Sequence, residues 1–496
     1  MSLDFDPYEI LGVATSATAE DIKNAYRRIA RRLHPDSNPN HPGAALQFRD
    51  ISAAHDLLND AIKRRMYDEK VRRLREQGDL SFTMRVTPSR RKLPQLPEPQ
   101  VLYLLAEINP DHRAALSSED KREARLNLTL VLDRSNSMNG PRLEKVKVAA
   151  HQIIDGLNAN DIVSVVTFSD RAEVIIPATP VRDKLALKAR VSMFGASGGT
   201  EIYHGLAAGV QQNRQFLGPK LVNHIILLTD GRTFGDQDQC LELAQQAAKE
   251  GIGISAMGLG DEWNDEFLDA LASKTGGTSE YINTAGAVVR FLNDRVRGLA
   301  NAFAERMRMT IAPESDVKLE LAFRLNPSPQ PLDFESGELH LGNLQFERSL
   351  SVLLQLQLPP NLEIGFRPAA RLVAEGDVLQ NKQQHRHTVS DITIEVVERP
   401  DLEKPSTAIL DALSKLTLYR LQEKAQEALL TGNIAEATRR LENLATRLLA
   451  LGQNELATQA LTEARRVAHT SGFSDKGRMT IKYQTRHLLL GSGEDV

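Results

Sequence analysis

Apolar positions near the start of the chain recur with the period of an α-helix. Between residues 20 and 33 they fall at spacings of four, three and four: Ile22, Tyr26, Ile29 and Leu33. This pattern predicts an amphipathic helix with one buried face. A second helix is predicted from a further set with compatible spacing: Phe48, Ile51, Leu58 and Ile62. The turn-rich stretch SNPNHPG lies between the two sets, so we expect two helices that flank an exposed loop.

The pattern changes over residues 124–302, where short apolar runs alternate with helix-like segments. The runs are Leu126–Leu132, Ile162–Phe168, Val222–Thr229 and Ile252–Leu259. Continuous apolar runs of this length are typical of strands buried on both faces. Their alternation with helices predicts a doubly wound, Rossmann-like α/β domain, whose ligands bind beyond the carboxyl ends of the strands.

The segments around this α/β domain have strand-like alternation. Residues 303–400 carry several such segments separated by turns, which predicts an all-β unit. A lone strand-like piece, Val101–Ile108, precedes the α/β domain and has no partner nearby in the sequence. Before it, four prolines stand among basic residues, and this composition predicts an extended linker over residues 76–100.

Helical spacing returns over residues 401–472. Four leucines share one broad face, and two glycines mark helix ends: Leu410, Leu413, Leu416, Leu421, Gly432 and Gly452. One such unit is too few for a solenoid, so we expect a helical bundle that packs on the β unit or forms oligomers. The tail, residues 473–496, alternates weakly and receives no role.

Composition and charge narrow the class of protein. With 496 residues the chain exceeds a single domain several times, and its net charge of -4 argues against a nucleic-acid binder. Residues 1–95 are nevertheless basic, with 17 cationic and 13 anionic side chains. The single cysteine, Cys240, excludes an intramolecular disulfide and a cysteine-rich zinc site. Since we find neither a signal peptide nor a membrane span, we expect a cytoplasmic protein.

Candidate chemistry in the basic region lies at the end of the first predicted helix. A His-Pro-Asp triplet follows that helix, and its proline pushes the preceding residue out of helical geometry. The triplet consists of His34, Pro35 and Asp36. The polar face of the helix carries a basic row: Lys23, Arg27, Arg28 and Arg31. Like charges at this spacing repel mildly, so they are not there for helix stability.

Residues 5–70 as a whole resemble the J-domain of DnaJ-type co-chaperones. The resemblance rests on the triplet and on Tyr8, Leu11, Gly12, Val13, Tyr26, Phe48, Ala54, Leu57, Tyr67 and Asp68. It implies that the basic row docks onto the acidic surface of a DnaK-type heat-shock chaperone, whose ATP hydrolysis the triplet triggers. The alternative is a J-fold kept as a packing module. The chain has neither the cysteine repeats nor the Gly/Phe-rich region of other subtypes, so it is similar to class C.

Polar residues stand where two predicted strands of the α/β domain end. An Asp-x-Ser-x-Ser sequence follows one strand, an aspartate follows another, and a threonine comes after a glycine pair. These residues are Asp133, Ser135, Ser137, Thr200 and Asp230. Singly, each also fits a helix cap or a turn. Together they form an all-oxygen set, which suits Mg²⁺ or Mn²⁺ and disfavours zinc or copper.

In this order the five residues resemble the metal-ion-dependent adhesion site (MIDAS) of the von Willebrand factor type A (vWA) fold. The similar region spans roughly residues 124–300, and Asn136 stands where glycine is frequent. The resemblance implies a binding module in which an acidic residue of a protein partner completes the metal's coordination. By analogy with similar architectures, it also implies that the vWA domain is inserted into a β-sandwich.

An enzyme is not expected. Residues 195–199 match the G-x-S-x-G pattern of hydrolases, but that motif requires a strand before its serine. The preceding KLALKARVSMF instead has helical character. The neighbouring glycines also lack the lysine of a phosphate-binding loop.

The sequence therefore predicts a multidomain chain. Its parts are a J-domain (1–75), a linker (76–100), a β-sandwich (101–123 and 303–400), a vWA domain (124–302), a helical region (401–472) and a tail (473–496). The predicted function is a co-chaperone adaptor that brings a DnaK-type chaperone to a protein bound by the vWA domain through Mg²⁺. The alternative is a metal-dependent scaffold or substrate adaptor for an AAA+ ATPase. Neither nucleic acid nor a membrane is expected as a partner.

Overall fold

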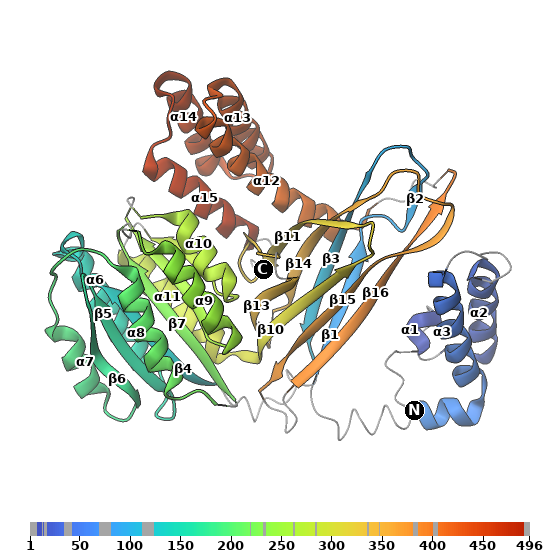
Figure 1. Cartoon of the computed structure of the whole chain (residues 1–496), viewed down its shortest axis with the longest axis horizontal. Coiled ribbons are helices and arrows are strands. Elements are labelled where there is room, and N and C mark those ends of the chain that lie inside the picture. Colours follow the sequence, from blue (N-terminus) through green and yellow to red (C-terminus); the bar gives the residue numbers. More distant parts are fainter. Residues whose placement is uncertain are drawn as a thin grey trace.

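The computed structural model describes residues 7–11, 13, 17–33, 42–68, 81–111, 124–218, 220–231, 235–260, 263–282, 285–334, 337–346, 348–379, 385–399 and 405–490. These residues form an N-terminal helical unit, an α/β domain, a sandwich of two five-stranded sheets and a C-terminal helical unit (Figure 1). The predicted multidomain fold class is thus confirmed. Within the described part of the chain, we find no helix with the length and apolar content needed to span a membrane.

The N-terminal unit contains α1 (Pro7–Leu11), α2 (Ala19–Leu33) and α3 (Pro42–Asn59). Its core is formed by Tyr8, Leu11, Ile22, Ala25, Ile51, Ala54 and Leu58. One expectation is wrong: Ile62 is 72% exposed and does not belong to the buried face of α3. The backbone N–H groups of Ile62 and Lys63 donate to Asp60 Oδ1 at 2.9 and 3.1 Å, so a new helical turn begins there.

The two sheets of the sandwich take strands from both sides of the α/β domain. The first has the order β1 (Phe82–Pro88), β3 (Gln100–Pro110), β14 (Leu350–Leu358), β11 (Lys318–Asn326), β12 (Gln330–Pro331). The second has the order β13 (Glu338–Gln345), β10 (Ala302–Pro313), β15 (Gly365–Val378), β16 (His385–Val397), β2 (Lys92–Pro94). Apolar side chains of both sheets, among them Leu104, Leu354 and Leu372, share one core.

The linker predicted over residues 76–100 is wrong from Phe82 onwards. β1 pairs antiparallel with β3, and β2 pairs in parallel with β16. Both are edge strands of their sheets, where a proline without an N–H removes no ladder hydrogen bond. Phe82 and Leu93 are buried in the sandwich core, which holds this segment in place.

The α/β domain is built on a six-stranded sheet. Its order is β6 (Ala172–Pro180), β5 (Ile162–Phe168), β4 (Arg125–Asp133), β7 (Leu221–Thr229), β8 (Gly253–Leu259), β9 (Ser279–Ile282). All four predicted strands are present. The two that the sequence did not reveal lie at the edges, where β6 joins antiparallel and β9 is short. β6 carries no continuous apolar run because most of its side chains are exposed or half-buried, and β9 has only four residues.

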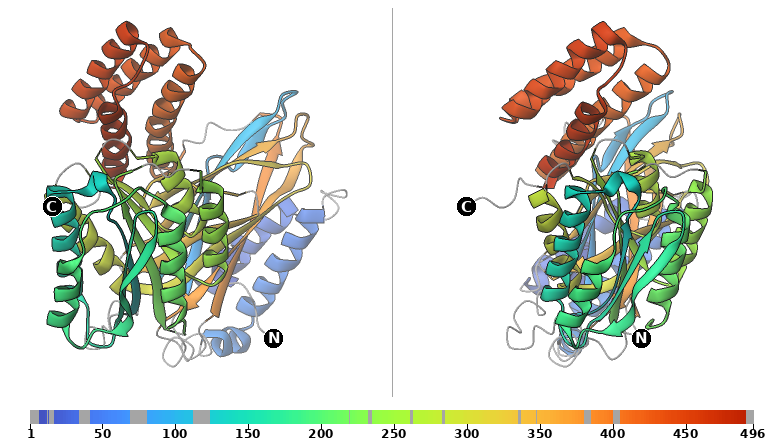
Figure 2. Two further views of the ribbon diagram at one scale, coloured as in Figure 1. Left: turned by 60° about the vertical axis from the view of Figure 1, so that its left-hand side comes forward. Right: turned by 90° about the vertical axis from the view of Figure 1, so that its left-hand side faces the viewer.

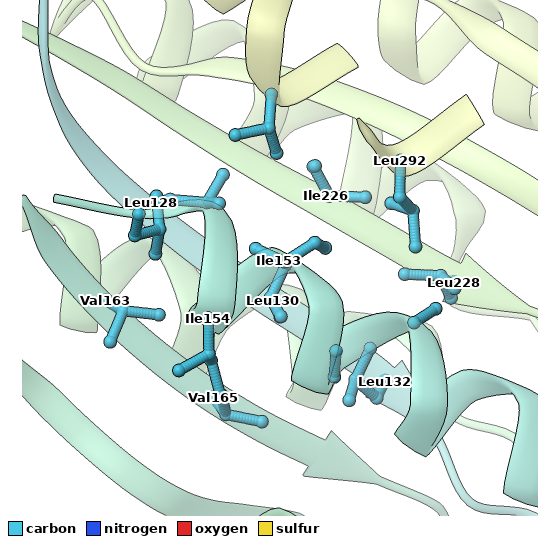
Figure 3. Close-up of a cluster of buried hydrophobic side chains, with 14 of the residues drawn as sticks. Leu128, Leu130, Leu132, Ile153, Ile154, Val163, Val165, Ile226, Leu228 and Leu292 are labelled. Atoms are coloured by element: carbon cyan, nitrogen blue, oxygen red, sulfur yellow. The ribbon is translucent and has the colours of Figure 1, made fainter. Parts of the chain in front are cut away.

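Helices cover both faces of this sheet. One face is covered by α6 (Pro141–Gly156), α7 (Lys184–Met193) and α11 (Ala285–Ala300). The other is covered by α8 (Ile202–Arg214), α9 (Gln237–Lys249) and α10 (Asp265–Lys274). Figure 3 shows the first of these cores, where Leu130 and Ile226 of the strands lie beneath Ile153 of α6. Burial on both faces explains the continuous apolar runs in the sequence.

The C-terminal unit contains α12 (Thr407–Leu430), α13 (Ile434–Ala450), α14 (Asn454–Thr470) and α15 (Asp475–Leu490) (Figure 2). Gly432 and Gly452, each with φ of 76°, follow the ends of α12 and α13. Ile409 and Leu416 of α12 pack on Phe323 of the sandwich. The prediction of a tail is wrong, because α15 is a full helix that returns to the α/β domain.

Candidate functional site

Four of the five predicted ligand residues lie at the carboxyl ends of two neighbouring parallel strands. Asp133 is the last residue of β4, and Asp230 directly follows β7. Ser135 and Ser137 lie in the turn after β4, which includes a short 3₁₀ helix, η2 (Asn136–Met138). Because β4 and β7 pair in parallel, their ends bring both carboxylates to the same edge of the sheet.

Hydrogen bonds tie these four residues into one network. Ser137 Oγ donates to Asp230 Oδ1 at 2.7 Å and lies 3.0 Å from Ser135 Oγ. The backbone N–H of Ser135 donates to Asp133 Oδ1 at 2.8 Å, and Thr229 Oγ1 donates to Asp133 Oδ2 at 2.7 Å. A carboxylate has about four acceptor positions, so these carboxylates keep capacity for a further partner.

Thr200, the fifth residue, reaches the site from the loop before α8. A Cβ atom placed on Gly231 would lie only 3.1 Å from Thr200 Oγ1, so the threonine packs directly beside the residue that follows Asp230. Its loop is held by Asp170, whose Oδ1 accepts the N–H of Gly199 at 2.8 Å. The structure therefore brings all five predicted residues to one edge of the sheet.

Both carboxylates are deeply buried. Asp133 is 0% exposed and Asp230 is 2% exposed. Burial raises the pKa of Asp133 and the neighbouring charge of Asp230 raises it further, while hydrogen bonds from Thr229 and Ser135 oppose the rise. Two buried carboxylates in one network are costly without compensating positive charge, which a cation at this site would supply.

A cation from the chain itself contacts the site. Arg142, at the start of α6, donates from Nη1 to Asp230 Oδ2 at 2.8 Å, while its side chain is 48% exposed. Nothing in the sequence pointed to this residue, because an exposed arginine in the first turn of a helix is common. The sequence also did not reveal Thr229 and Asp170. Their contacts with the site form only when separate strand ends meet in the folded protein.

The donor set fits a hard cation. It offers two carboxylates and three hydroxyls, the oxygen ligands preferred by Mg²⁺ and Mn²⁺. Within the described ranges, no group of three or more His, Cys, Asp or Glu side chains is placed to hold a metal. Ser197 of the hydrolase-like motif lies in the loop after α7 and follows a helix, as expected from the sequence.

The predicted chaperone-docking residues lie on α2. Lys23, Arg27 and Arg31 are exposed, and Arg28 lies on the same helix. α3 faces the sandwich, where Phe366 of β15 packs on the core of the N-terminal unit. His34, Pro35 and Asp36 lie outside the described residues.

Three parts of the chain match known protein families. The chain matches the DnaJ domain over residues 6–68, the von Willebrand factor type A domain over residues 127–293, and the Sll0103-like C-terminal α-helical domain over residues 407–491. It therefore contains a DnaJ domain and a vWA domain.

Individual proteins extend these matches. The chain is 30% identical over 391 residues to the uncharacterized protein sll0103 of Synechocystis sp., covering 76% of this chain and 91% of that protein. The chain therefore belongs to the Sll0103-like family. Its DnaJ domain is 52% identical over 64 residues to chaperone protein DnaJ 2 of Mycolicibacterium paratuberculosis, a match that spans 13% of this chain and 16% of that protein.

Solved structures share the fold well beyond the vWA domain. A von Willebrand factor type A protein from Catenulispora acidiphila superposes with a TM-score of 0.66 at 15% identity, covering 82% of this chain and 96% of that one. The ArnB paralog VWA2 from Sulfolobus acidocaldarius gives a TM-score of 0.53 at 13% identity, covering 82% and 98%. These likenesses concern the fold alone.

Proposed function

We propose that this protein is a J-domain co-chaperone adaptor. Its vWA domain binds a protein partner through Mg²⁺ or Mn²⁺, and its J-domain stimulates a DnaK-type heat-shock chaperone beside that partner. The observation that carries the proposal is the convergence of Asp133, Ser135, Ser137, Thr200 and Asp230 at one sheet edge, in a chain that also contains a DnaJ domain.

We assign the five converging residues of the vWA domain as an intact MIDAS. When bound, the cation supplies a positive centre that an acidic side chain of the partner can approach. The residues of the chain hold that centre: the carboxylates balance its charge, and the hydroxyls provide neutral oxygens. Thr229 and the backbone of Ser135 orient Asp133 by their hydrogen bonds.

The chaperone half is supported by the exposure of the basic row. α3 packs toward the sandwich, while Lys23, Arg27 and Arg31 of α2 remain exposed and available to an acidic surface. We assign triggering of ATP hydrolysis to His34, Pro35 and Asp36, in a J-domain of class C type. The protein then has no catalytic activity of its own and acts in the cytoplasm, where it meets its chaperone.

Metal-dependent capture from native lysate tests this function. Wild-type protein is expected to retain a partner and a DnaK-type chaperone with Mg²⁺, and to lose the partner with EDTA or in Asp133→Ala. Mass spectrometry identifies what is retained. Partner capture that survives both EDTA and the substitution contradicts the metal half. A ring ATPase retained without a DnaK-type chaperone favours an AAA+ scaffold instead.

Removing Arg142 is expected to strengthen cation binding. Its guanidinium pairs with Asp230 in a partly exposed position, and such pairs are worth up to about 1 kcal/mol, so Arg142→Ala should raise Mg²⁺ or Mn²⁺ affinity by up to about fivefold. Isothermal titration calorimetry measures the change. Arg439→Ala, an exposed arginine of α13, is the matched control and should leave the affinity unchanged. A weaker affinity in Arg142→Ala would show that Arg142 supports the metal.

A further inference from the structure

A polar cavity lies at the opposite end of the α/β sheet from the candidate metal site, where this domain meets the sandwich. Its volume is about 190 Å³. The amino ends of β7 and β8 form one wall through residues 222–224 and Gly253, and α11 contributes Arg295 and Leu299. The facing wall comes from β10, β13 and β15 of the sandwich. No predicted residue of the MIDAS or the J-domain lines this cavity.

The charged lining of the cavity contains more cations than anions. The cations are Lys249, Arg295, Arg306 and Arg308, and the acids are Glu305 and Asp377. Both acids approach the same arginine: Asp377 pairs with Arg306 Nη2, and Glu305 Oε1 lies 4.0 Å from Arg306 Nε. Arg308 pairs with Glu375 at 3.0 Å.

Two cations of the lining, Arg295 and Lys249, have no ion pair among the described residues. In the described part of the chain Arg295 forms neither a hydrogen bond nor an ion pair, and its Nε atom is buried without a partner. Lys249 lies exposed at the rim, also without an ion pair among the described residues. The Arg295 side chain is half-buried, and the charge of Glu280 acts on it without a direct ion pair, so its guanidinium keeps donors for a further anion.

The surroundings of Arg295 add positive charge. Burial lowers the pKa of Arg295 to about 10, and the charge of Glu280 opposes that change. Arg324 has its pKa lowered to about 9 by burial and by the nearby charges of Arg295 and Arg486, while it donates to the carbonyls of Gly276 and Gly277 at 2.9 and 2.6 Å. Burial raises the pKa of Glu305 to about 8, while the charge of Arg306 opposes the rise.

The wall opposite Arg295 is built with strained backbone. Arg306 has a φ of 53° inside β10, where the pairing with β15 shifts register between Glu305 and Arg308. Gly251, whose φ is 79°, lies against Arg306, and a Cβ atom there would be 2.3 Å from Arg306 Cδ, so glycine is favoured at this position. Bulges and left-handed residues are common where a strand shapes a binding site.

We propose that this cavity binds a small oxyanion of phosphate size, with Arg295 as its main charged partner and Lys249 at the rim. A planar guanidinium with free donors matches two oxygens of such an anion. The cavity volume of about 190 Å³ limits the size of the ligand, because pockets for drug-sized ligands measure about 300–1,000 Å³. A nucleotide is therefore too large, whereas phosphate, sulfate or a small carboxylate fits.

Titration of the full chain with inorganic phosphate tests this site. The buffer contains EDTA, which separates the result from the MIDAS, and ionic strength is held constant with chloride. We expect saturable binding by calorimetry with a Kd near the millimolar range or tighter, and a rise in Tm that chloride does not produce. Parallel titrations with sulfate and acetate distinguish a tetrahedral dianion from a carboxylate.

Arg295→Gln should weaken phosphate binding at least about tenfold, since it removes a charge-assisted hydrogen-bond donor pair. Arg439→Gln on α13 is the control and should bind as wild type. If Arg295→Gln does not fold, Arg295→Lys and Lys249→Gln replace it, and both should weaken binding about threefold or more. Absence of saturable binding to the wild type, or unchanged binding in the folded cavity variants, overturns the proposal.

Discussion

Replacing Asp269 with asparagine is expected to destabilise the junction between α10 and α15 by about 3–5 kcal/mol. Arg486 donates to Asp269 Oδ1 and Oδ2 at 2.9 and 2.5 Å, and Lys482 Nζ lies 2.9 Å from Oδ2. All three side chains are largely buried. The neutral amide would leave Arg486 and Lys482 buried with less negative charge to balance them. A buried ion pair that loses only one partner is strongly destabilised for this reason.

The single tryptophan provides the measurement. Trp263 lies beside this junction, with its ring centroid 5.7 Å from that of Tyr483 on α15, so its fluorescence reports local unfolding. Urea and thermal unfolding of Asp269→Asn should begin earlier than in wild type. Asp411→Asn is the control, because its carboxylate is 60% exposed and its i, i+4 pair with Lys415 on α12 is worth about 0.5 kcal/mol or less. Equal stability of both variants would contradict the account.

The same network predicts a pH dependence. Burial alone would raise the pKa of Asp269, but Arg486 and Lys482 outweigh it and hold that pKa far below the ordinary value of about 3.9. A carboxylate with a depressed pKa in the folded state contributes stability above its unfolded pKa and loses it as pH falls further. The stability difference between wild type and Asp269→Asn should therefore shrink below about pH 4. A constant difference down to pH 2 would contradict this assignment.

Asp133→Asn is expected to abolish cation binding, with a loss of affinity of at least about 100-fold. The change removes one of the two charges that balance the cation but keeps the size of the side chain, so the strand end should remain folded. Calorimetry with Mn²⁺ and Mg²⁺ measures the loss.

An aspartate elsewhere in the same domain serves as the control for that loss. Asp155→Asn affects a 53% exposed carboxylate paired with Lys188 and should bind metal as wild type does. Binding that persists in Asp133→Asn would exclude Asp133 from the ligand set. A loss of similar size in Asp155→Asn would instead indicate general damage to the domain.

The site was predictable because its residues follow local signals. Asp133 and Asp230 directly follow two apolar runs, and parallel strands bring such ends together, so sequence order alone placed them at one edge. The J-domain helices followed in the same way from the spacing of Ile22 and Tyr26. These signals are short range and need no knowledge of the tertiary structure.

What the sequence did not reveal depends on contacts between distant segments. Asp269 and Arg486 are 217 positions apart, so nothing near α15 indicates that its cations are buried partners of α10. The prolines around β2 predict a linker, whereas in the structure Pro88 and Pro94 end two edge strands, β1 and β2, where they are tolerated. Arg142 was missed since only the fold brings it to Asp230.

The most direct test of the central claim is single-turnover ATP hydrolysis by a DnaK-type chaperone from the same organism. The account predicts that the full chain accelerates hydrolysis and that His34→Gln, which changes the proposed trigger, does not. Asn136→Gly, a change in the other module toward the frequent MIDAS pattern, should accelerate hydrolysis like wild type. Failure of the wild-type chain to accelerate hydrolysis, or equal acceleration by His34→Gln, would contradict the co-chaperone function.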